Sequence, residues 1–129
     1  MSKNSKILVV EDEPDFNQLL CHVLKENGYQ VQSATNGEEG FKLYRTWGPD
    51  GVILDVHLPD MTGFEICRKI RTEGPEPETP VLICTVRSEV SGVAEGLGSG
   101  ADDYILKPFQ ISDFLARLQT ALSREKKEE

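Results

Sequence analysis

Four apolar runs in the sequence each end in a polar residue that could act on a phosphate group. An ionised carboxylate is costly to bury, so a buried strand does not need one at its end for packing. Residues 7–10 are followed by Glu11 and Asp12, and residues 52–54 by Asp55. Residues 81–84 are followed by Thr85, and residues 104–106 by Lys107. One such coincidence is weak evidence, but four together indicate a functional site.

The residue types at these four positions favour phosphoryl chemistry with a hard metal ion. Three carboxylates that meet repel one another, at roughly 3 kcal/mol per pair for ~5 Å and an effective dielectric constant of ~20. Protons or a cation must offset this repulsion. An all-oxygen set without His or Cys favours Mg²⁺. The ammonium group of Lys107 and the hydroxyl of Thr85 suit phosphoryl oxygens. A carboxylate can itself be the nucleophile that accepts a phosphoryl group.

Strand-like and helix-like segments alternate along the chain and would position these residues. Predicted strands cover residues 7–10, 29–34, 52–54, 81–84 and 103–106, and predicted helices cover 14–24, 36–44, 64–70, 90–97 and 111–122. This alternation implies an α/β protein with a parallel sheet covered on both faces. Parallel strands all end at one edge, where open sheets of this class bind ligands. We therefore expect the polar residues that follow the strands to meet there.

Length and composition indicate one globular domain. The chain has 129 residues, 38% hydrophobic and 28% charged, which is typical of a folded and not a disordered protein. We expect a single domain over 1–129, with a core over about 6–123 and a charged tail over 124–129. The acidic, proline-rich segment 74–80 is predicted to be a surface loop.

Charge and cysteine content exclude several classes of function. The net charge of −8 argues against direct nucleic-acid binding by this domain. No apolar stretch approaches the length of a membrane span and no signal-peptide region precedes the first strand, so we expect a cytoplasmic protein without membrane contact. Cys21, Cys67 and Cys84 are odd in number and widely spaced. We interpret them as small hydrophobic residues, not as a metal site or disulfides.

Taken together, the pattern Glu11-Asp12, Asp55, Thr85 and Lys107-Pro108 resembles the receiver domain of two-component response regulators, at the usual spacing. The resemblance extends from residue 7 to residue 122. Residues 58–63 look like the loop after the phospho-acceptor, and 100–104 like the approach to the last strand. It implies a flavodoxin-like, doubly wound (βα)5 fold with strand order 2-1-3-4-5. It also implies a signalling module, not an enzyme, that catalyses only its own phosphorylation and slow autodephosphorylation.

The family implies a role for each matching position. Asp55 would take a phosphoryl group from a phosphohistidine on a sensor histidine kinase or a histidine phosphotransfer protein. Glu11, Asp12, Asp55 and the backbone carbonyl of His57 would frame Mg²⁺. Lys107 would hold the phosphate, beside a peptide bond to Pro108 that is cis in relatives, an isomer that proline tolerates.

Two further positions would transmit the signal. Thr85 would move towards the phosphate while Tyr104 turns inward, which would change the face formed by residues 90–97, 103–106 and 111–122. Tyr104 could also serve plain strand packing. Val86 is larger than the small residue usual there and, with His57 and Arg87, leaves the phosphoryl lifetime open.

The last helix suggests a surface for self-association. Residues 101–103 and 114–118 are similar to receivers of winged-helix transcription factors, which dimerise through Asp–Arg pairs. On this hypothesis Arg117 and Arg124 pair with Asp102 or Asp103 across a phosphorylation-stabilised homodimer. A solvated charged face is an equal alternative, because exposed ion pairs contribute little.

Two other classes of function compete. A Mg²⁺-dependent phosphatase of the haloacid-dehalogenase type also uses an aspartate at a strand end, but carries a second acid two positions later, where this chain has His57. A flavin- or nucleotide-binding module would need a glycine-rich loop after the first strand. Residues 11–13 are acidic instead and would repel phosphate.

Overall fold

The computed structural model describes residues 4–86 and 100–126, with only the backbone for 124–126. Its strands are β1 (Lys6–Val10), β2 (Gln30–Ala34), β3 (Gly51–Asp55), β4 (Val81–Val86) and β5 (Asp103–Lys107). Its helices are α1 (Pro14–Glu26), α2 (Gly37–Trp47), α3 (Gly63–Glu73) and α5 (Ile111–Lys126). The predicted helix over 90–97 lies outside the described residues.

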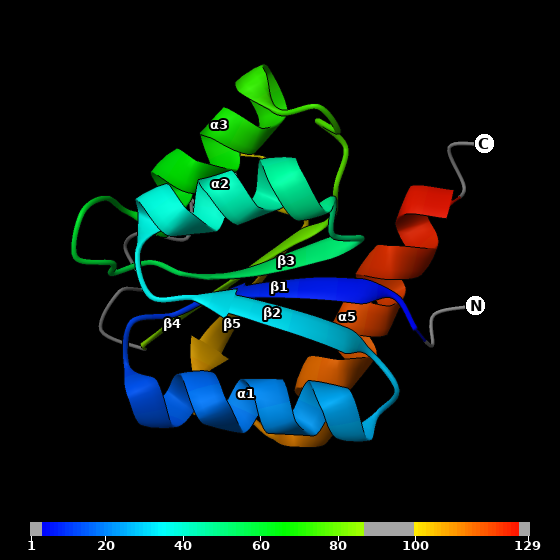
Figure 1. Cartoon of the computed structure of the whole chain (residues 1–129). Coiled ribbons are helices and arrows are strands. Elements are labelled where there is room, and N and C mark those ends of the chain that lie inside the picture. Colours follow the sequence, from blue (N-terminus) through cyan, green and yellow to red (C-terminus); the bar gives the residue numbers. More distant parts are fainter. Residues whose placement is uncertain (1–3, 87–99, 127–129) are drawn as a thin grey trace.

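All five strands are parallel and form one sheet in the order β2-β1-β3-β4-β5, which confirms the predicted order. Helices α2 and α3 cover one face and α1 and α5 the other (Figure 1). Successive strand side chains point to opposite faces. Leu8 and Val10 therefore join the core beneath α2 and α3, while Ile7 and Val9 join the core beneath α1 and α5.

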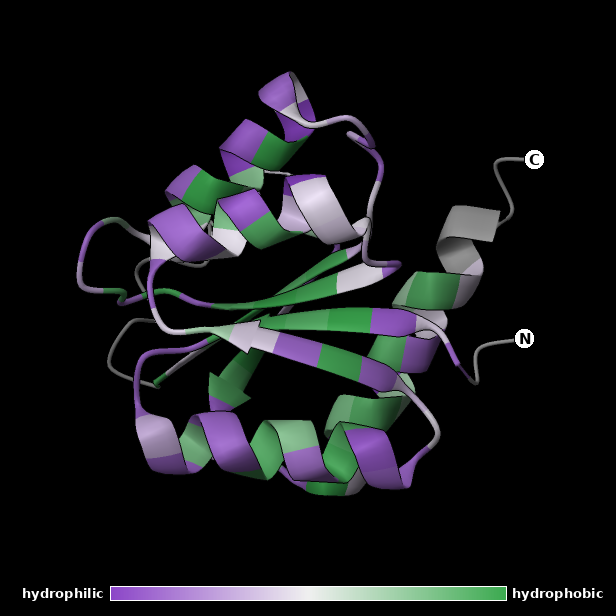
Figure 2. Ribbon diagram, in the orientation of Figure 1, coloured by the Kyte–Doolittle hydropathy of each residue, from purple (hydrophilic) through white to green (hydrophobic). Residues whose placement is uncertain are grey.

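Hydropathy follows these layers. The inner strands are apolar over most of their length, and the helices carry polar residues interspersed with apolar ones (Figure 2). Every residue of β3 is buried, whereas the edge strand β2 is mostly exposed, with Val31 half-buried between two exposed glutamines. Burial on both faces explains the unbroken Val, Ile and Leu runs of the central strands.

Local sequence signals set the starts of α1 and α3, the helices that follow β1 and β3. Pro14 occupies the first turn of α1, and the Glu13 carboxylate accepts the backbone N–H of Phe16 at 2.7 Å. Thr62 and Glu65 form a reciprocal capping box at the start of α3. Such caps satisfy N–H groups that have no partner within the helix. They fix where the loops after β1 and β3 end.

The strand register brings the predicted site residues to one edge. Val10 pairs with Leu54, Asp55 with Cys84, and Val86 with Lys107. Glu11 and Asp12 follow Val10 directly. The predicted strand ends were therefore correct to within one or two residues.

The remaining predictions about the body of the protein have mixed outcomes. Cys67 and Cys84 are buried, as expected, but Cys21 is only half-buried; none of the three forms a disulfide. Residues 75–78 are exposed, as predicted for a surface loop, although Thr79 is buried. No helix among the described residues is long and apolar enough to cross a membrane.

Candidate functional site

The three predicted carboxylates meet at the carboxyl edge of the sheet. One oxygen from each of Glu11, Asp12 and Asp55 lies within 4.8 Å of the others. Glu11 is 2% exposed and Asp55 9%, whereas Asp12 is exposed. The cluster is therefore buried at Glu11 and Asp55 and open to solvent at Asp12, so a ligand from solvent can reach it.

Lys107 reaches into this cluster from the end of β5. Its Nζ lies 3.0 Å from Glu11 Oε1 and 3.3 Å from Asp55 Oδ1. The Lys107–Pro108 peptide bond is cis, as the resemblance implied. Val86, opposite Lys107 in the register, is 44% exposed. The ammonium group of Lys107 thus faces the carboxylates of Glu11 and Asp55, next to the solvent-exposed Val86.

Burial and the charges of neighbouring groups both shift the pKa values in the cluster. Burial raises the pKa of Asp55 above its ordinary value, although Lys107 opposes this change. Burial also raises the pKa of Glu11, with the charge of Asp55 acting in the same direction. Burial acts to lower the pKa of Lys107, but the carboxylates of Asp55 and Glu11 outweigh it and raise that pKa. The cluster therefore favours protons or cations that reduce its negative charge.

Thr85 lies near the end of β4, and Tyr104 lies near the start of β5. Thr85 is fully buried, and its hydroxyl oxygen has no hydrogen-bond partner among the described residues. Tyr104 is half-buried, and its ring stacks on Phe64 of α3 at 6.4 Å between centroids. A buried hydroxyl normally has a partner, so the Thr85 hydroxyl is available to a group that reaches the site.

The loop after β3 covers residues 56–62 and leads into α3. The His57 side chain is exposed, and its backbone forms an isolated bridge with Thr62. Gly63 lies so close to the Asp55 carbonyl oxygen that a Cβ at this position would collide with it. Glycine is therefore required for α3 to begin directly beside the candidate phospho-acceptor.

Several residues that support the site were not singled out from the sequence. Asn17 is buried and donates from Nδ2 to the Glu11 carbonyl oxygen at 2.9 Å. The Glu11 carboxylate also accepts the backbone N–H of Glu13 at 3.0 Å. An asparagine within the apolar face of α1 is the only sequence signal that could have indicated Asn17, because buried polar side chains need partners.

Asp60 is a second supporting residue that the sequence did not reveal. Its carboxylate accepts the backbone N–H groups of Gly37 at 2.7 Å and Glu38 at 2.9 Å, at the start of α2. Although burial acts to raise it, these hydrogen bonds hold the pKa of Asp60 below its ordinary value. The loop after Asp55 is thus tied to the neighbouring helix.

Three of the four charged residues proposed for a dimer face, Asp102, Asp103 and Arg117, form ion pairs within the chain. Arg117 Nη1 lies 2.9 Å from Asp103 Oδ1, and Arg71 Nη2 lies 3.0 Å from Asp102 Oδ2. Arg124 lies where side chains are not described. The Asp–Arg pairing expected across two copies is therefore found inside one copy for Arg117, and the dimer remains a prediction.

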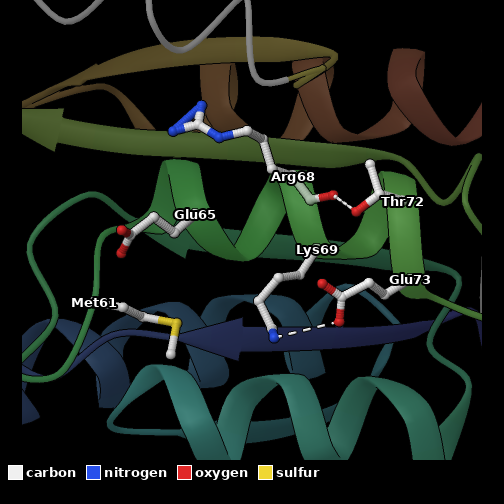
Figure 3. A pocket seen from close by; sticks show the side chains of 6 residues that line it. All are labelled: Met61, Glu65, Arg68, Lys69, Thr72 and Glu73. Atoms are coloured by element: carbon white, nitrogen blue, oxygen red, sulfur yellow. Dashed lines mark hydrogen bonds and ion pairs between the residues drawn. The ribbon is translucent and has the colours of Figure 1, made fainter.

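A separate hollow of about 390 Å³ lies on the outer side of α3 (Figure 3). Its lining residues are Met61, Glu65, Arg68, Lys69, Thr72 and Glu73. Lys69 and Glu73 form an ion pair of 3.5 Å within it. None of the predicted site residues lines this hollow, so it is distinct from the acid cluster.

Comparison with known proteins matches residues 7–119 to the response regulator receiver domain. The response regulator MprA of Mycolicibacterium vanbaalenii is 41% identical over 119 residues, which are 92% of this chain and 51% of that protein. MprA of Mycobacterium avium is 40% identical over 124 residues, 96% of this chain and 54% of that protein. The chain thus spans about half the length of the curated relatives it matches.

Solved structures show the same fold. A CheY-like receiver domain protein of Methanospirillum hungatei has a TM-score of 0.90 at 27% identity, covering 97% of this chain and 98% of that chain. The BeF3-activated DrrB receiver domain has a TM-score of 0.80 at 37% identity, covering 92% and 97%. The receiver domain of the sensor histidine kinase PA1611 of Pseudomonas aeruginosa, with a magnesium ion coordinated in its active site cleft, has a TM-score of 0.85 at 25% identity, covering 93% and 98%.

Proposed function

Because this chain belongs to the response regulator receiver domain family, a family of two-component signalling modules, we propose that Asp55 is its phospho-acceptor. The donor would be a phosphohistidine on a sensor histidine kinase or a histidine phosphotransfer protein. The observation that carries this proposal is the convergence of Glu11, Asp12 and Asp55 within 4.8 Å, with Lys107 Nζ at 3.3 Å from Asp55 Oδ1. The family match leaves the haloacid-dehalogenase alternative without support.

The donor set of the cluster fits Mg²⁺. It offers carboxylate oxygens from Glu11, Asp12 and Asp55, with no nitrogen or sulfur ligand among them, and hard cations prefer such oxygens. The backbone carbonyl oxygen of His57 would be the fourth protein group to hold the ion. When bound, the ion neutralises charge that develops on the phosphoryl oxygens. Its two positive charges also offset the repulsion among the carboxylates.

The chain's own residues would perform the transfer. A carboxylate oxygen of Asp55 forms a bond to phosphorus as the bond from phosphorus to the donor imidazole breaks, and the leaving imidazole retains the electron pair of that bond. Lys107 is placed to exchange its contact with Asp55 Oδ1 for one to a phosphoryl oxygen. Such transfer needs mainly positioning and charge neutralisation. The buried Asp55 carboxylate and the adjacent Lys107 ammonium group would supply them.

Thr85 and Tyr104 would convert the phosphoryl group into a change of surface. The buried Thr85 hydroxyl lacks a partner among the described residues and would gain one by donating to a phosphoryl oxygen. Movement of Thr85 would leave space for Tyr104, whose ring now stacks on Phe64. A ligand shifts such an equilibrium only through its different interactions with the two states. The new hydrogen bond to Thr85 would supply that difference.

The decisive experiment is incubation with acetyl phosphate and Mg²⁺, followed by intact mass measurement. We expect one added phosphoryl group on the wild-type chain. Asp55→Asn and chelation of Mg²⁺ should each abolish the addition. Asp15→Asn, which changes an exposed acid in the first turn of α1, is the matched control and should label normally. An Asp55→Asn chain labelled as fully as wild type would refute the assignment.

A further inference from the structure

Lys107 carries its charge on a flexible stem, yet its ammonium group has a third neighbour besides the two carboxylates. The Nζ atom lies 4.2 Å from the centroid of the Phe16 ring. This is well inside the ~6 Å at which an aromatic face attracts a cation. Glu11, Asp55 and the Phe16 ring together surround the ammonium group.

The Phe16 ring is itself held by other aromatic rings. It meets Phe109 edge to face, with centroids 5.8 Å apart and an interplanar angle of 71°. Phe109 stacks on the fully buried Phe114 at 5.4 Å. The backbone N–H of Phe16 is fixed by the Glu13 cap. Phe109 therefore links the Phe16 ring to the buried Phe114 of α5, and the Glu13 cap holds the Phe16 backbone in the first turn of α1.

We propose that Phe16 is a positioning residue for phosphoryl transfer, because its ring face keeps the Lys107 ammonium group over the acid cluster. This inference rests on the function proposed above. A free lysine side chain samples many rotamers, so fixing its ammonium group costs conformational entropy. The ring gives the ammonium group an attractive partner that remains in place while Lys107 exchanges Asp55 Oδ1 for a phosphoryl oxygen.

Simple packing is the competing explanation for Phe16. Phe16 is half-buried and packs against the core cluster that includes Leu20 and Leu24, and an aliphatic side chain could fill much of the same space. Packing requires volume, whereas the proposed role requires an aromatic face. Variants that separate these two properties therefore test the proposal.

The test compares Phe16→Leu and Phe16→Met, which retain apolar bulk, with Phe16→Tyr, which retains the ring face. We expect the initial rate of phosphoryl uptake from acetyl phosphate to fall about three- to tenfold in the Leu and Met variants. The Tyr variant should stay within about twofold of wild type. Phe41→Leu is the matched control, because Phe41 also has cations over its ring, Lys69 at 4.8 Å and Arg45 at 5.4 Å, but lies on the other face.

A second readout needs neither metal nor phosphate. The Lys107 Hε protons should show an upfield ring-current shift by NMR in wild type and Phe16→Tyr, and lose it in Phe16→Leu. Wild-type rates in the Leu and Met variants, or a Tyr variant as slow as Leu, would overturn the proposal, as would an absent shift in wild type. Failure of wild type to take up phosphate would refute the proposed function instead. The NMR shift would then still decide whether Phe16 holds the ammonium group.

Discussion

The Lys107 ammonium group lies 3.0 Å from Glu11 Oε1, although 96 positions separate the two residues in the chain. This pair links the first and last strands of the sequence across β3 and β4, which lie between them in the sheet. It neutralises only part of the local charge, because three carboxylates meet one lysine. The site is therefore built at a cost in stability that a bound cation or a proton reduces.

Asp55→Asn should stabilise the metal-free protein. The pKa of Asp55 is raised by burial despite Lys107, so its charge is a net cost to the folded state. Removing that charge should increase the free energy of unfolding by roughly 1 kcal/mol at neutral pH, measured by urea denaturation with a chelator present.

Adding Mg²⁺ is the control for that prediction. An ion that binds only the folded state adds about 1.4 kcal/mol at ten times its dissociation constant. Wild type, with all three carboxylates, should gain more from Mg²⁺ than Asp55→Asn does. A variant that is less stable than wild type without metal would contradict the electrostatic account.

The cost of the Asp55 charge should also appear in the pH dependence of the free energy of unfolding. A carboxyl group whose pKa is raised in the folded state binds more protons there than in the unfolded chain. Its contribution to stability is therefore lost as pH rises from the ordinary value, 3.8 for Asp55 and 4.5 for Glu11, through the raised pKa. The stability advantage of Asp55→Asn over wild type should consequently be near zero at pH 3 and increase through this window.

Paired urea titrations of the two metal-free proteins between about pH 3 and pH 8 would measure this difference. Asp60 contributes in the opposite direction, because its pKa is lowered. Its stabilisation is present above pH 3.8 and is lost as pH falls through the lowered pKa. It affects both proteins equally, so it cancels in the difference. A difference that is constant over the whole range would show that Asp55 does not titrate differently on folding.

Thr85→Val should stabilise the unphosphorylated protein while impairing the switch. The Thr85 hydroxyl is fully buried without a partner among the described residues, and an unsatisfied buried polar group costs about 1–3 kcal/mol. Valine has nearly the same shape, so the free energy of unfolding should rise by about 1 kcal/mol. Phosphoryl uptake at Asp55 should persist, but the NMR signals of the Tyr104 ring should no longer respond to it.

Thr85→Ser is the control, because it keeps the hydroxyl and removes only a methyl group. It should be less stable than wild type and retain the Tyr104 response. A Thr85→Val protein whose Tyr104 signals still shift on phosphorylation would remove Thr85 from the switch.

Residue order alone was sufficient to predict the charged residues that meet at the site. Glu11, Asp55 and Lys107 each follow an apolar run, and parallel strands must end at one edge, so their convergence follows from the chain pattern. The helix caps also follow from local sequence, and the Asn36 side chain accepts the Glu39 N–H as its residue type indicates. These inferences needed only neighbours in sequence and the rule for parallel sheets.

The supporting contacts could not be predicted in this way. Asn17, Asp60 and Arg71 act on backbone groups of segments that are distant in sequence or unremarkable in composition. Their hydrogen-bond partners depend on how the helices pack on the sheet. A short sequence motif does not determine that packing. The Asp–Arg pairing is an instructive case: residue types suggested pairs between copies, and the fold supplies Arg117 with Asp103 inside one chain.

Arg71→Lys should destabilise the protein by about 2 kcal/mol, although it conserves charge. The Arg71 guanidinium donates to the carbonyl oxygens of Gly100, Pro77 and Thr79 and to the Asp102 carboxylate, at 2.6–3.0 Å. A lysine ammonium group cannot reach four acceptors spread around a planar fork.

Arg68→Lys is the matched control for this substitution, because Arg68 is exposed on the same helix. Its effect should stay within about 0.5 kcal/mol. Urea denaturation would measure both variants, and hydrogen exchange would localise the loss. The Val81 N–H, which donates to Asp102 Oδ2 at 2.8 Å, should exchange faster in Arg71→Lys alone, because Asp102 loses the guanidinium that orients it. Equal stability of the two variants would show that the network around Arg71 is not what holds the start of β4 against the approach to β5.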